Sequence, residues 1–164
     1  MLPAQVDAHR QGQRLTGHLV EHLMSVAPDF ELWGLLWEED AGRVQPVVHP
    51  VTGDLSLPAS LAGVMEQIRP ELIFHLAGAT SVASSWDQPD RSFQVNALGT
   101  LNLLEAARHL DVRPTTVVAS SAEIYGAVPI GRQPIAEAEP LDPISPYAAS
   151  KAAQNLIAAN THLA

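Results

Sequence analysis

Two residues with complementary proton chemistry stand four positions apart in the segment SPYAASKAAQ, at the start of a predicted helix. This spacing places Tyr147 and Lys151 on one face of that helix. A phenol has an ordinary pKa of about 10, and a nearby ammonium group lowers it by favouring the phenolate. The pair could then exchange a proton with a substrate hydroxyl during hydride transfer. The alternative is a surface lysine beside a helix-start tyrosine.

The usage of basic residues adds weight to the functional interpretation. The chain has eight arginines and a single lysine, Lys151, and Tyr147 is one of only two tyrosines. The one side-chain ammonium group of a chain that otherwise uses arginine for positive charge therefore lies four residues from a tyrosine.

A hydroxyl-bearing segment, SSAEIYG, directly follows the β-branched run TTVVA at 115–119, which predicts a strand. Ligands of parallel sheets bind beyond the carboxyl ends of the strands, so Ser121 should face the expected site. Its hydroxyl would hydrogen-bond the reacting oxygen. The alternative is an ordinary cap or turn serine.

The elements that must position these residues alternate along the chain. Apolar spacing predicts helices from about Leu15 to Val26, then at 58–68, 90–110 and 147–162, and short apolar runs predict strands at 31–37, 44–51, 72–77 and 115–119. Such alternation is typical of an α/β fold with a doubly wound, Rossmann-like parallel sheet. We expect this sheet to be incomplete, because the first 14 residues lack a central apolar strand and a G-x-G-x-x-G turn.

Composition excludes several classes of function. The net charge of −9 disfavours binding to nucleic acid, and no apolar run approaches the length of a membrane span. The chain has no cysteine, which excludes disulfides and thiolate metal sites. A cytoplasmic protein that binds neither nucleic acid nor membrane is the simplest expectation.

Beyond these residues, three further segments resemble the extended short-chain dehydrogenase/reductases: Gly53-Asp54-Leu55, His75-Leu76-Ala77-Gly78 and Val95-Asn96-Ala97-Leu98-Gly99-Thr100. The stretch SSWDQPDRSFQVNALGTLNLLEAAR is most similar to GDP-mannose 4,6-dehydratases and GDP-4-dehydro-6-deoxymannose reductases. The resemblance runs from about Gly17 to Asn160 and corresponds to the first half of a family member.

The resemblance implies catalytic roles for four residues. Ser121, Tyr147 and Lys151 match the family's Ser/Thr, Tyr and Lys, and Glu123 matches the base of the 4,6-dehydratases. These enzymes act on nucleotide sugars, so dehydration of a substrate such as GDP-mannose is the first expectation. Reduction of a 4-keto sugar or 4-epimerisation is the alternative, because Ala122 stands where dehydratases often carry an acidic or hydroxyl residue and some reductases keep the Glu.

The resemblance also implies contacts with NAD or NADP. Asp54, with Leu55 beside it, matches the contact to adenine; Leu76, Ala77 and Gly78 match the strand motif along the cofactor; and Asn96 matches the residue that sets the active-site backbone. Gly17 matches the last glycine of the phosphate loop. Gln11 and Arg14 stand where the first two glycines belong, so their side chains should obstruct the pyrophosphate. The acidic residues at 38–40, which follow Trp37, favour NAD over NADP as the cofactor.

The expected organisation is a divergent segment at 1–16 and a partial dinucleotide-binding domain at 17–164, with the substrate domain missing. In the family, helices matching 90–110 and 147–162 form a dimer interface, so a homodimer is expected. Whether the chain is an active enzyme stays open, because an inactive fragment that only folds or dimerises would show the same departures from the family's sequence.

The pattern His18-x-x-Glu21-His22 resembles a zinc-peptidase motif, but we expect no metal, because the same stretch is an ordinary first helix in the family.

Overall fold

The computed structural model describes residues 3–7, 13–37 and 45–161. Its centre is a five-stranded, all-parallel sheet in the order β3-β2-β1-β4-β5. The strands are β1 (Pro3–Asp7), β2 (Glu31–Leu36), β3 (Val48–Thr52), β4 (Leu72–His75) and β5 (Thr115–Val118). This confirms the α/β parallel fold predicted from the alternating elements.

The central strand corrects one expectation. Residues 3–7 pair with β2 from Pro3↔Glu31 to Asp7↔Leu35, and with β4 from Ala4↔Leu72 to Val6↔Phe74. The prediction that the N-terminus lacks this strand is therefore wrong. A parallel ladder is built from backbone groups, so the short, weakly apolar run PAQVD can supply it between two strongly apolar neighbours.

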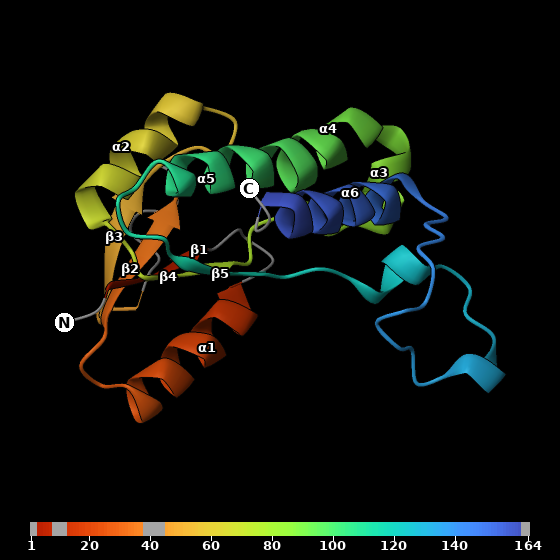
Figure 1. Ribbon diagram of the computed structural model, residues 1–164, viewed down its shortest axis with the longest axis horizontal. Coiled ribbons are helices and arrows are strands. Elements are labelled where there is room, and N and C mark those ends of the chain that lie inside the picture. The colour runs from red at the N-terminus through yellow and green to blue at the C-terminus, as the bar shows by residue number, and fades with distance from the viewer. Residues whose placement is uncertain (1–2, 8–12, 38–44, 162–164) are drawn as a thin grey trace.

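Helices cover both faces of the sheet (Figure 1). Helix α1 (Gln13–Val26) covers one face, where Val20 and Leu23 pack with Leu32 and Val48. On the opposite face lie α2 (Pro58–Ile68), α5 (Gly99–Arg108) and α6 (Pro146–Thr161). The main core there includes Leu61, Met65, Ile73 and Leu103, all fully buried.

The alternation within the strands explains this division. In β2, Leu32 packs on the α1 face and Leu35 on the α2 and α5 face, and in β4 Phe74 and Ile73 divide in the same way. Apolar side chains on both faces are what a buried parallel sheet requires.

The single helix predicted at 90–110 is the prediction that differs most from the structure. It is preceded by α3 (Val82–Asp87) and consists of α4 (Pro89–Phe93), a π-helical segment η2 (Gln94–Leu98) and α5. The extra residue in a π turn shifts the side chains that follow it to a new face. Two short 3-10 helices, η3 (Ala122–Tyr125) and η4 (Ile130–Arg132), interrupt the loop before α6. No helix in the described ranges is long and apolar enough to span a membrane.

Candidate active site

The strand order predicts a ligand site between β1 and β4. Strands β2 and β3 extend the sheet to one side of β1, while β4 and β5 extend it to the other side. Ligands of doubly wound sheets bind at such a switch point, beyond the carboxyl ends of the strands. The residues that follow β4 and β5 there include Gly78 and Ser121.

Ser121 caps the short helix η3 at this edge. Its Oγ accepts a hydrogen bond from the backbone N–H of Glu123 at 3.3 Å, and its side chain is half-buried. The neighbouring Glu123 is exposed, in the first turn of η3. Both side chains lie beyond the carboxyl end of β5, as the sequence predicts.

A glycine ties η3 to the segment that leads into α6. Gly126 has a positive φ of 63°, and a Cβ there would meet the carbonyl oxygen of Asp142. Asp142 in turn donates its N–H to the carbonyl of Ile124 at 3.0 Å. Since Gly accepts this backbone conformation without steric cost, the long loop can return against η3 and bring the start of α6 beside it.

The start of α6 follows from its local sequence. The Oγ of Ser145 accepts the N–H of Ala148 at 3.0 Å, which satisfies one of the free donors of the first turn, and Pro146 opens the helix. One turn of this helix then carries both predicted catalytic side chains inward. Tyr147 is 8% exposed and Lys151 is 5% exposed.

Lys151 is held by two uncharged acceptors. Its Nζ donates to the carbonyl of Ala119 at 2.7 Å and to Oε1 of Gln154 at 2.6 Å. Burial lowers the pKa of the Lys151 ammonium to about 8, because a charged group is disfavoured away from water. An ammonium has three N–H donors, so one remains directed to neither acceptor.

Asn96, in the π-helical segment, fixes the loop after β4. Its Oδ1 accepts the N–H of Ala79 at 2.8 Å, and its Nδ2 donates to the Ala79 carbonyl at 3.1 Å and to Ser150 Oγ at 2.8 Å. The neighbouring Gly78 allows this approach, because a Cβ there would lie 2.8 Å from Asn96 Oδ1 and 3.5 Å from Lys151 Nζ. Asn96 therefore joins the β4 loop to α6, and its predicted role at the active site stays a prediction.

The remaining predicted residues lie around this centre. Ala77 belongs to the core against α2 and α5, and Leu76 packs on the α1 side. Asp54 follows β3 and accepts hydrogen bonds from the N–H and hydroxyl of Ser56, both at 2.8 Å. The roles predicted for these residues in binding a cofactor stay predictions.

Two further predicted positions complete the set. Leu55 is buried, and a Cβ on Gly99 would lie 3.1 Å from its Cβ. Gly17 lies within α1, where a Cβ would meet Nε2 of Gln45 at 3.5 Å. Gln11 and the acidic residues at 38–40 lie outside the described residues.

Three polar residues behind Lys151 were assigned no role in the site from the sequence, although His75 and Thr100 lie in segments that carry the family resemblance. Gln154, Thr100 and His75 are all fully buried, and hydrogen bonds connect them. A usable signal was present, since Gln154 follows Lys151 by three and Thr100 follows Asn96 by four, spacings that place each pair on one helical face.

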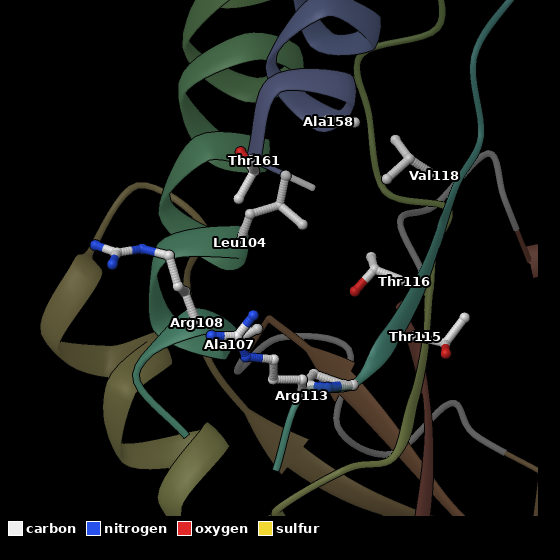
Figure 2. A pocket seen from close by; sticks show the side chains of 10 residues that line it. Leu104, Ala107, Arg108, Arg113, Thr115, Thr116, Val118, Ala158 and Thr161 are labelled. Carbon is white, nitrogen blue, oxygen red and sulfur yellow. The ribbon is translucent and has the colours of Figure 1, made fainter. Parts of the chain in front are cut away.

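A cavity of about 620 Å³ lies elsewhere, beside β5 and the last turns of α5 and α6 (Figure 2). Its lining includes Leu104, Arg113, Thr116 and Ala158 but none of the predicted catalytic residues. This cavity therefore does not coincide with the predicted catalytic residues at the carboxyl edge of the sheet.

The zinc-like pattern on α1 forms an exposed pair. His18 Nδ1 lies 3.5 Å from Glu21 Oε2, and both side chains are more than two-thirds exposed. Among the residues that the structure describes, no three His, Asp or Glu side chains gather at one point.

Known proteins are similar to this chain in sequence and in fold. The family model described as GDP-mannose 4,6 dehydratase matches residues 18–164. A GDP-6-deoxy-D-mannose reductase from Pseudomonas aeruginosa is 36% identical over 85% of this chain and 42% of its own length. A GDP-mannose 4,6-dehydratase from Vibrio cholerae is 38% identical over 60% of this chain and 27% of its own.

Solved structures extend the match to the N-terminal strand. The Thermus thermophilus UDP-glucose 4-epimerase in complex with NAD superposes with a TM-score of 0.84 at 33% identity, covering 99% of this chain and 51% of that one. The RMD protein of Pseudomonas aeruginosa, complexed with NADPH, gives a TM-score of 0.76 at 28% identity, with 99% and 50% covered. The chain thus spans about half the length of these two solved relatives. It belongs to the GDP-mannose 4,6-dehydratase family of the extended short-chain dehydrogenase/reductases.

Proposed function

We propose that this chain carries the catalytic half of an NAD(P)-dependent enzyme that modifies a nucleotide sugar. The proposal is carried by two buried polar groups on α6, the Tyr147 hydroxyl and the Lys151 ammonium, which have unused hydrogen-bonding capacity. Among the described residues, the Tyr147 hydroxyl has no hydrogen-bond partner and Lys151 keeps one N–H unused, although both side chains are more than nine-tenths buried. Buried polar groups in native proteins are normally paired, so unpaired ones at a ligand edge are suited to a substrate or cofactor.

The residues present fit a nicotinamide dinucleotide at the inner part of the site. The free N–H of Lys151 suits a ribose hydroxyl, and the absence of a side chain at Gly78 keeps the space in front of Nζ open. When bound, the nicotinamide supplies reversible acceptance of a hydride. The two solved relatives named above contain NAD in one case and NADPH in the other, and the proposal covers both.

The chain's own groups would handle the protons. Tyr147 as phenolate takes the proton from the sugar C4 hydroxyl as C4 is oxidised, and the Lys151 ammonium stabilises that phenolate. Ser121 donates a hydrogen bond to the C4 oxygen. In a 4,6-dehydration the carboxylate of Glu123 would take the C5 proton and pass it to the C6 hydroxyl, which leaves as water. The proton held by Tyr147 would then replace the one lost at C5, and the bound nicotinamide would supply the hydride for C6.

Dehydration of a nucleotide sugar such as GDP-mannose is the proposed reaction because Glu123 supplies a carboxylate beside Ser121 on η3. Reduction of a 4-keto sugar or 4-epimerisation needs only Ser121, Tyr147 and Lys151. The relative named as a GDP-6-deoxy-D-mannose reductase matches 85% of this chain, which supports reduction as the alternative reaction. Replacement of Glu123 separates the two, because Glu123→Gln should stop dehydration and spare a reductase or epimerase.

A non-catalytic role is the second candidate. Gln11 and Arg14 stand where the family carries two glycines of the phosphate loop, and the division into a segment at 1–16 and a dinucleotide-binding domain at 17–164 stays a proposal. Apolar side chains remain exposed on the helices expected to dimerise: Phe93 (39%), Leu98 (52%) and Leu156 (53%). A homodimer through these helices, catalytically inactive, accounts for these features without turnover.

Turnover of nucleotide sugars decides between the two. The chain is assayed with GDP-mannose and dTDP-glucose in the presence of NAD or NADP, together with Tyr147→Phe. The matched control is Tyr125→Phe, since Tyr125 is the other tyrosine and lies half-buried on η3. The proposal expects activity that Tyr147→Phe abolishes and Tyr125→Phe keeps. Undetectable turnover by the unaltered chain supports the inactive fragment.

A further inference from the structure

A line of buried polar side chains runs behind the catalytic lysine, from the sheet to α6. His75 on β4 lies with its Nε2 2.8 Å from Thr100 Oγ1 on α5. Thr100 Oγ1 also lies 2.8 Å from Gln154 Nε2, and Gln154 Oε1 lies 2.6 Å from Lys151 Nζ. His75, Thr100 and Gln154 are 0% exposed.

The protons in this line have one consistent arrangement. Thr100 has a single hydroxyl hydrogen, and it donates that hydrogen to the Asn96 carbonyl at 2.7 Å. Its oxygen must therefore accept from both other neighbours, which places a hydrogen on Nε2 of His75 and points the amide NH₂ of Gln154 toward Thr100. The Gln154 oxygen is thereby turned to Lys151, because a flipped amide would face the ammonium with its own N–H groups.

Lys151 has no carboxylate to balance it among the described residues. On the elements packed against α6, the charged and titratable groups lie exposed or half-exposed and beyond ion-pair reach of Nζ: Asp87, Asp90, Arg91, Glu105, Arg108, Glu123 and Tyr125. His75 on β4 contacts Thr100, and Tyr147 precedes Lys151 on the same helix. The hydrogen-bond acceptor nearest to the ammonium is therefore the oxygen of a neutral amide, that of Gln154.

We propose that Gln154, oriented by Thr100 and His75, is a positioning residue that holds the Lys151 ammonium at the active site without neutralising its charge. The inference rests on the proposed function, because it assigns Lys151 the task of stabilising a tyrosine phenolate. A carboxylate at this position would pair with the ammonium and weaken its effect on Tyr147. An apolar side chain would leave the buried ammonium with one acceptor and let Nζ move.

The sole lysine makes this testable directly. Lysine labelled with ¹³C at Cε gives one side-chain resonance in this chain, and its shift against pH reports the pKa of Lys151 without cofactor, substrate or turnover. Gln154→Met removes the amide at similar length and should lower that pKa by about one unit or more, since a hydrogen bond to a charged group is lost. Gln154→Glu should raise it by about one unit or more.

The control is Asn155→Ala, the next residue on α6, which is exposed and should leave the lysine pKa unchanged. If Gln154→Met does not fold, Thr100→Val frees the amide to turn and should also lower the pKa. Equal lysine pKa values in the unaltered chain, Gln154→Glu and whichever of Gln154→Met or Thr100→Val folds would overturn the proposal.

A kinetic readout then separates positioning from simple stabilisation. In an active enzyme, Gln154→Met should reduce kcat and displace the pH-rate profile while a folded circular-dichroism spectrum is retained. Absence of turnover in the unaltered chain would contradict the proposed function alone, because the lysine titration does not depend on it. Normal turnover with an unshifted pH profile in Gln154→Met would contradict the positioning role alone.

Discussion

Replacement of Asn96 by Leu should be among the most destabilising polar changes in this chain. Asn96 is 0% exposed and makes three hydrogen bonds, two to the backbone of Ala79 and one to Ser150. Leu has a similar volume, so little cavity is created, but the three partners lose their bonds. At about 1 kcal/mol for each bond, the free energy of unfolding should fall by about 3 kcal/mol. The melting temperature should then fall by about 6–12 °C.

Urea unfolding followed by tryptophan fluorescence measures this difference. The matched control is Asn102→Leu on α5, because Asn102 is half-buried and, among the described residues, its side chain makes one hydrogen bond, to the Leu55 carbonyl at 2.8 Å. That variant should lose only about 1 kcal/mol. A loss below about 1 kcal/mol for Asn96→Leu, or an equal loss in both variants, would refute the view that Asn96 fixes the loop after β4.

Further predictions follow from individual contacts. Gly126→Ala should cost about 2 kcal/mol or more in urea unfolding, because φ is 63° and the new Cβ meets the Asp142 carbonyl; an unchanged midpoint would contradict this. The buried Lys151, with a pKa of about 8 against 10.5 unfolded, makes the folded state bind fewer protons, so stability should rise between pH 8 and 10.5. The rise should be about 3 kcal/mol greater than in Lys151→Met, and parallel curves for the two proteins would exclude it. Leu156→Glu should abolish any dimer detected by sedimentation, whereas Ile130→Glu should not, because Ile130 is exposed on η4, away from the helices expected to dimerise.

The parallel fold was largely predictable from sequence, because its apolar runs are short, separated by amphipathic helices and strongly patterned. The helix α2 begins at Pro58 and ends at Ile68, as predicted, since proline opens it and Arg69 takes a left-handed conformation after it. The β1 strand was not predictable in this way. Its pairing is made by the backbone, and PAQVD carries too few apolar side chains to signal a central position.

Candidate site residues could be named from the sequence where chemistry demands particular residue types, and their roles stay predictions. Ser121, Tyr147 and Lys151 are recognisable from type and spacing, and the structure places them at one edge of the sheet. The π-helical segment was not predictable, since its sequence QVNAL continues a regular helical pattern. The hydrogen-bonded line of Gln154, Thr100 and His75 was not predictable either, because it joins three elements, although Thr100 and His75 lie in segments that carry the family resemblance.

We propose that the edge of this sheet binds a nicotinamide dinucleotide beside Lys151. The most direct test is calorimetric titration of the chain with NAD, NADH, NADP and NADPH, repeated with Lys151→Met. We expect saturable binding of at least one of these dinucleotides. Lys151→Met should weaken that affinity at least about tenfold, because a charge-assisted hydrogen bond is lost. Absence of binding up to about millimolar dinucleotide, the weak end of common affinities, would contradict it.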